Sequence, residues 1–196
     1  MRIKYGLYLF LFFGLSAAAS GKPKGPIRVA CIGNSITYGY GLADRDREAY
    51  PVLLQQKLGA KYQVENFGKS GATLLARGHR PYFLQEEYKK ALAFRPDIAV
   101  IHLGVNDTDP RNWPNYQDEF ITDYHHLIDT LRAVNPQVRI LIARTTPIGV
   151  EHPRFESGTR DWQLQIQQAI EQVAKSADVE LIDFHTPLYP YPHYFP

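Results

Sequence analysis

Two hydrophobic patterns alternate along the chain after residue 26. Short, nearly continuous runs of β-branched and other apolar residues predict buried strands. These runs lie at 27–32, 62–67, 97–103, 138–143 and 179–182. The longer segments between them have apolar residues at every third or fourth position, which is typical of amphipathic helices.

The clearest helical stripe comprises Phe120, Tyr124, Leu127, Ile128, Leu131 and Val134. Asn135-Pro136 ends it, because proline cannot continue a helix. Further helices are expected over 46–58, with Pro51 in the first turn, over 81–94, and from Trp162 to Ala177.

Strands that alternate with helices indicate a parallel sheet covered by helices on both faces. We therefore predict an α/β fold: a five-stranded, three-layer α/β/α sandwich of the flavodoxin-like type, formed by one domain over residues 21–196. In such sheets the active site lies at the carboxyl ends of the strands. No helix follows the fifth predicted strand, so we expect one uncovered sheet face and a C-terminally incomplete domain.

Residues 1–20 have the composition of a secretory signal peptide. Arg2 and Lys4 precede an apolar run of about eleven residues, and small residues follow at 16–21. The run is too short to span a bilayer, so we expect a secreted or periplasmic protein without a stable membrane anchor.

Removal of that segment changes the charge balance. The chain has 22 basic and 20 acidic residues, and two of the basic ones lie within 1–20, which leaves 20 of each. A neutral domain has no electrostatic reason to bind nucleic acid. Cys31, the single cysteine, excludes an internal disulfide and is predicted to be a buried structural thiol.

Three loops that follow consecutive predicted strands contain residues suited to acyl transfer. They are 33–37, with Ser35; 68–73, with Gly71; and 104–107, with Asn106. The carboxyl ends of parallel strands meet at one edge of a sheet, so these residues should converge. A serine hydroxyl is a nucleophile, whereas a glycine N–H and an asparagine amide can hold an oxyanion. Taken singly, the three residues also suit a helix cap, a turn glycine and an Asx turn.

In this order, the three loops resemble the sequence blocks of the SGNH (GDSL-type) hydrolase family, over nearly the whole chain after residue 27. The resemblance implies that Ser35 is the nucleophile and that Gly71 and Asn106 contribute to the oxyanion hole. It implies no metal or organic cofactor. Asn34 stands where the family has aspartate, a change we expect to be tolerated because that acid is not the proton acceptor. Asp107 is expected to hold its loop by hydrogen bonds.

The family also has an Asp-x-x-His pair near the C-terminus, in which the histidine is the general base. Here Asp183-Phe184-His185 has the wrong spacing, and no acid precedes His193 at the right distance. We therefore expect the pair to lie beyond Pro196 and the 196-residue chain to be inactive. His185 and His193 are weaker candidates for the base, and His125 and His126 are expected on a solvated helix face.

The expected function is hydrolysis of acyl esters, acetyl esters of carbohydrates above all, through an acyl-enzyme on Ser35. Among the members of the family, exported carbohydrate O-acetylesterases, including the sialate type, are the most similar. Trp113 and Tyr116 are equally suited to the substrate cleft and to the core. The alternatives are a lysophospholipase-like or thioesterase-like hydrolase and a non-catalytic carbohydrate-binding protein on the same fold.

Overall fold

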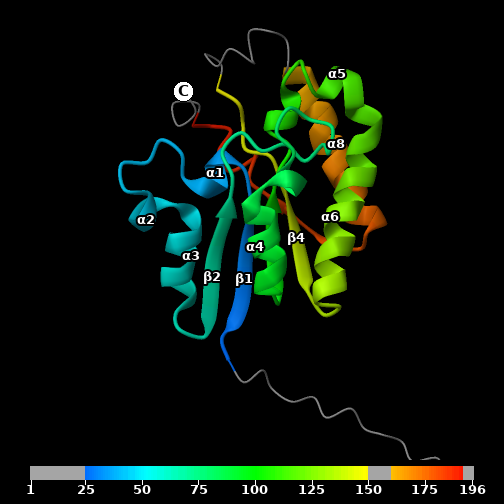
Figure 1. The fold of residues 1–196 in the computed structure, drawn as a ribbon. Helices are drawn as coiled ribbons and strands as arrows, with labels where there is room; N and C mark the ends of the chain where they lie inside the picture. Colours follow the sequence, from blue (N-terminus) through cyan, green and yellow to red (C-terminus); the bar gives the residue numbers. More distant parts are fainter. Residues whose placement is uncertain (1–24, 150–159, 192–196) are drawn as a thin grey trace, which may run out of the picture.

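The computed structural model describes residues 25–149 and 160–191 (Figure 1). The predicted signal peptide lies outside this part of the chain. Five parallel strands form one sheet in the order β2-β1-β3-β4-β5. The strands are β1 (Ile27–Gly33), β2 (Tyr62–Gly68), β3 (Ile98–His102), β4 (Arg139–Arg144) and β5 (Glu180–Asp183). This is the flavodoxin-like order, and it confirms the predicted fold.

Three long helices cover one face of the sheet: α4 (Glu86–Phe94), α6 (Phe120–Val134) and α8 (Arg160–Ser176). Alternate residues of the strands point to this face because side chains of a strand alternate between its two sides. They are Ala30, Ile32, Ala99, Ile101, Ile140 and Ile142, all buried in the main hydrophobic cluster. The apolar stripe predicted for α6 packs here, with Phe120, Tyr124, Leu127, Ile128 and Leu131 fully buried.

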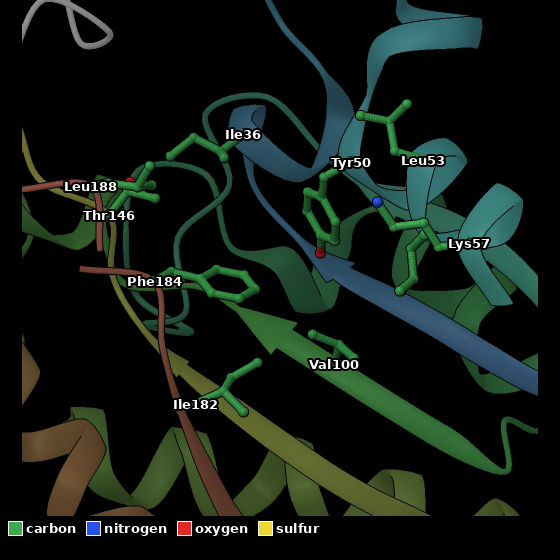
Figure 2. A pocket seen from close by; sticks show the side chains of 10 residues that line it. Ile36, Tyr50, Leu53, Lys57, Val100, Thr146, Ile182, Phe184 and Leu188 are labelled. Carbon is green, nitrogen blue, oxygen red and sulfur yellow. The ribbon is translucent and has the colours of Figure 1, made fainter. Parts of the chain in front are cut away.

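The opposite face is covered over β2 by α3 (Tyr50–Leu58). Beyond α3, a cavity of about 560 Å³ lies against the strands (Figure 2). Val100 of β3 and Ile182 of β5 form its floor, and Phe184 points into it. Among the described residues, this part of the sheet has no covering helix, as the sequence predicts.

Two predicted helices are each divided in the structure. The segment 46–58 forms α2 (Arg45–Glu48) and α3, separated by Ala49 in an extended conformation (ψ 138°). Pro51 explains the break, because in a continuous helix its ring would clash with the carbonyl of Arg47. The segment 81–94 forms η1 (Tyr82–Leu84) and then α4, with Gln85 extended between them.

The shorter elements lie in the loops at the carboxyl ends of the strands. They are α1 (Ser35–Tyr38), η2 (Asn106–Thr108), α5 (Trp113–Tyr116) and η3 (Gln117–Glu119).

Cys31 is buried in β1, and burial raises the pKa of its thiol to about 12, which confirms a structural role. No helix within 25–149 and 160–191 is long and apolar enough to cross a bilayer.

Candidate active site

Ser35 begins the short helix α1, directly after β1. Asn34 is the N-cap: its Oδ1 accepts a hydrogen bond from the backbone N–H of Ile36 at 3.0 Å. An asparagine oxygen caps a helix as well as an aspartate oxygen does. The exchange of the family's acid for Asn34 therefore preserves the turn that presents Ser35, which is half-buried.

The end of β2 holds α1 in place. Asn66 Nδ2 donates to the carbonyl of Thr37 at 2.8 Å. Gly68 lies so close to α1 that an added Cβ would be 2.2 Å from the backbone nitrogen of Tyr38. Gly68 is therefore needed for close packing, which leaves Gly71 as the oxyanion candidate in the loop that follows β2. Gly71 has a φ of +78°, a conformation that favours glycine.

Asn106 joins the third loop to the second. Its Nδ2 donates to the carbonyl of Ala72, next to Gly71, at 2.9 Å. The strand register brings the loops together as well, since Gly33 is paired with Gly68 on one side and with His102 on the other. The three predicted site residues are thus on adjoining loops at one edge of the sheet.

Asp107 fixes the loop that carries Gly71. Its carboxylate accepts hydrogen bonds from the backbone N–H groups of Leu74 at 3.0 Å and Leu75 at 2.8 Å. Burial raises the pKa of Asp107 to about 6, although the two N–H donors act in the opposite direction. The carboxylate therefore holds a loop by hydrogen bonds, but it is the neighbouring loop and not, as predicted, its own.

Asn112 is a further support that the sequence pattern did not indicate. Its side chain is fully buried and donates to the carbonyl of Asn106 at 2.8 Å. Its Oδ1 accepts from the backbone N–H of His79 at 2.9 Å.

Trp113, which follows Asn112, is in the core and donates to Gln165 at 2.6 Å. Tyr116 packs against the same core, so neither aromatic residue is placed as a cleft residue.

The histidines near the C-terminus do not form an acid–base pair in the described chain. Asp183 Oδ1 accepts from the backbone N–H groups of His185 and Thr186, so this carboxylate caps a turn. The ring of His185 is bonded through Nδ1 to the carbonyl of Thr145 at 3.1 Å. His193 lies outside the described residues.

One Asp-x-x-His spacing does occur within the chain, at Asp123 and His126, in addition to the C-terminal residues considered above. Both residues are on α6, in the helical layer. Asp123 accepts from the backbone N–H of Ala76 at 2.7 Å, and the ring of His126 packs against Phe83 with centroids 5.3 Å apart. Asp123 therefore holds the loop at Ala76 and His126 packs against η1, so both residues have a structural role.

His102, at the end of β3, is fully buried beneath the site. Its Nε2 accepts from the backbone N–H of Thr146 at 3.2 Å, and its ring packs against Phe184. Burial lowers the pKa of His102 to about 4 from an ordinary value of 6.5. Between these pH values the unfolded chain binds a proton that the folded chain excludes. His102 therefore makes the fold less stable as the pH falls from 6.5 to 4.

Replacing His102 with glutamine should remove this pH dependence while leaving an acceptor for Thr146. Relative to the unsubstituted protein, the His102→Gln variant is expected to gain about 3 kcal/mol in free energy of unfolding between pH 7 and pH 4. Urea unfolding at several pH values measures the difference. Asp107 titrates in the opposite sense, but it is present in both proteins and cancels. A stability difference that does not change with pH would contradict the expectation.

The strand order, together with a serine, a glycine and an asparagine on adjoining loops, is the arrangement of the SGNH class of hydrolases. The chain belongs to the GDSL-like Lipase/Acylhydrolase family, whose model matches residues 31–195.

Individual proteins show the same relationship. The chain is 39% identical over 176 residues to an acetylxylan esterase from Xylanibacter ruminicola. That match covers 81% of this chain and 36% of the relative, so the chain spans about a third of the relative's length.

Two solved structures have a similar fold. The acetyl xylan esterase AlAXEase superposes with a TM-score of 0.61 at 23% identity, covering 86% of this chain and 82% of its own. A carbohydrate acetylesterase family member from Sinorhizobium meliloti gives a TM-score of 0.62 at 20% identity, covering 80% of this chain and 82% of its own.

Proposed function

We propose that this protein is a serine esterase that removes acetyl groups from carbohydrates. The observation that carries the proposal is the joining of three loops at the carboxyl edge of the sheet: α1 rests on Gly68, and Asn106 is bonded next to Gly71. The substrate class is supported by the names of the relatives, an acetylxylan esterase and a carbohydrate acetylesterase family member.

In the proposed reaction, Ser35 Oγ bonds to the carbonyl carbon of the ester while its proton passes to a histidine. The carbonyl electron pair moves onto the oxygen, which the N–H groups of Ser35 and Gly71 and the amide of Asn106 would bind. Collapse breaks the bond to the sugar oxygen, which leaves with the proton from the histidine. Water, deprotonated by the same histidine, then releases acetate from Ser35.

We propose that this histidine is supplied by residues beyond Pro196. The open part of the sheet supports the proposal, because its cavity is next to α1: Ile36 forms one wall and Leu188 another (Figure 2). Two buried polar atoms beside the cavity, His102 Nδ1 and Thr146 Oγ1, have no hydrogen-bond partner in the described part of the chain. A segment that covered the cavity would bury its apolar walls and could pair with these atoms.

The cavity also favours a second candidate, a hydrolase for esters of longer acyl chains. Its lining includes Leu53, Leu54, Ile182 and Phe184, which would suit an alkyl chain that enters beside Ile36. Acyl-chain length distinguishes the two activities. An acetylesterase should prefer p-nitrophenyl acetate, whereas a longer-chain hydrolase should prefer the octanoate.

The test of the proposed function is to extend the reading frame past Pro196 and compare the longer chain with the 196-residue chain on p-nitrophenyl acetate and on an acetylated xylo-oligosaccharide. We expect an Asp-x-x-His in the extension and activity in the longer chain only. A frame that stops at Pro196, with no hydrolysis of any ester, would instead support a non-catalytic carbohydrate-binding protein.

We also propose that the protein is exported, on the basis of the signal-like composition of residues 1–20. Polymeric carbohydrates are extracellular substrates, so export agrees with the proposed substrate. N-terminal sequencing of the secreted or periplasmic fraction should find a chain that begins near residue 21. An unprocessed N-terminus in the cytosol would contradict export.

A further inference from the structure

Arg80 differs from the other arginines near the active-site loops in having no described carboxylate as a partner. Arg77 is paired with Glu119 at 2.8 Å, and Arg111 is paired with Asp109 at 2.8 Å. Arg80 is exposed, and within residues 25–149 and 160–191 no carboxylate lies within ion-pair distance of it. Its charge is therefore not neutralised by a described residue.

The side chain of Arg80 lies against Gly71. A Cβ added to Gly71 would be 3.3 Å from Arg80 Cδ and 3.4 Å from Arg80 Nη1. The guanidinium thus lies directly beside the backbone of the proposed oxyanion loop, where a side chain at residue 71 would crowd it.

The backbone fixes this proximity. The carbonyl of Arg80 accepts a hydrogen bond from the N–H of Thr73 at 2.9 Å, and the N–H of Tyr82 donates to the carbonyl of Thr73 at 2.9 Å. Residue 80 is thereby held opposite the loop that begins at Gly71. The same loop is anchored from its other side by Asp107, through Leu74 and Leu75.

We propose that Arg80 is a further residue of the catalytic machinery, whose positive charge stabilises the negative charge that develops on the ester oxygen at Gly71. This inference rests on the proposed function. The donors assigned so far, two backbone N–H groups and an asparagine amide, are all neutral. A cation beside them adds a Coulomb interaction that exists only while the oxyanion does, so it favours the transition state over the bound ester.

Coulomb's law gives the range of the effect. Two unit charges about 6 Å apart, at an effective dielectric constant between about 20 and 80, change a rate by about 3- to 100-fold. The exposed position of Arg80 favours the lower part of that range, because water and salt screen the charge.

The test uses the longer chain that hydrolyses p-nitrophenyl acetate, a neutral ester. Arg80→Gln is expected to lower kcat by about 3- to 100-fold with little change in KM, whereas Arg80→Lys should keep most of the activity. Added salt should slow the unsubstituted enzyme and the lysine variant more than the glutamine variant. Arg77→Gln is the matched control, since Arg77 is on the same loop and already paired; its kcat should not change.

Three results would overturn the inference. Equal losses in the lysine and glutamine variants would show that contacts, not charge, matter. A loss confined to esters with a carboxylate near the cleaved bond would make Arg80 a binding residue for anionic substrates. Full activity of Arg80→Gln, in an enzyme that Ser35→Ala inactivates, would support the esterase function but show that Arg80 takes no part in it. Activity that survives Ser35→Ala would instead reject the proposed function itself.

Discussion

Replacing Ser35 with alanine in the longer, active chain is expected to lower kcat by about a million-fold, to the background rate of the assay. The expectation follows from the acyl-enzyme route, in which the serine oxygen forms the bond to the ester carbon. In subtilisin, removal of the serine alone costs about 2 × 10⁶ in kcat, about as much as removal of the whole triad. Cys31, the single thiol of the chain, is not available as a substitute nucleophile, because it is buried with a pKa raised to about 12.

The measurement is steady-state hydrolysis of p-nitrophenyl acetate, together with mass spectrometry of the protein after rapid quenching. The unsubstituted enzyme should gain one acetyl group on the peptide that contains Ser35, and the variant should gain none. Ser176→Ala is a suitable control, since Ser176 is at the end of α8, where it contacts His125. An alanine variant that folds and still hydrolyses the ester would show that Ser35 is only the first residue of a short helix.

Most of the sheet could be predicted from sequence because buried parallel strands are short, apolar and β-branched. The helix breaks were harder to predict. Pro51 does lie in a first turn, as predicted, but it is the first turn of α3. The division of the segment into α2 and α3 at Ala49 does not show in the hydrophobic pattern. Gln85 carries no breaking signal at all, and its extended conformation is visible only in the structure.

Only some residues of the candidate site could likewise be predicted from the sequence. Ser35, Gly71 and Asn106 could be found because each follows a strand. Asn112 and Arg80 could not, because they reach the site through loops whose course depends on tertiary contacts. Asp123 and His126 are the opposite case: their spacing matches the catalytic motif, but their contacts in the structure are with Ala76 and Phe83. A short motif therefore needs its structural context before it indicates chemistry.

Replacing Asn106 with alanine is expected to lower kcat by about 10²- to 10³-fold, or about 2.7–4 kcal/mol of transition-state stabilisation, with a small change in KM. The side chain amide is an oxyanion donor in the proposed reaction, and it also bonds to the carbonyl of Ala72 at 2.9 Å. Loss of that bond should lower the free energy of unfolding by about 1 kcal/mol. The variant should therefore remain folded while its turnover falls.

The catalytic and structural parts of the Asn106 effect are separated by measuring kcat per folded molecule, because Asn106→Asp, like Asn106→Ala, loses the bond to the carbonyl of Ala72. Asn106→Asp keeps the shape of the side chain but replaces an N–H donor with an oxygen acceptor, which repels the oxyanion; its kcat should fall at least as far as that of the alanine variant. Asn115→Ala is the control, because Asn115 is exposed and bonds only within its own loop among the described residues. If thermal unfolding of Asn106→Ala accounted for the whole loss, with normal kcat per folded molecule, Asn106 would be a loop support like Asp107. A loss in kcat at unchanged folded fraction and nearly unchanged KM supports a role in the oxyanion hole.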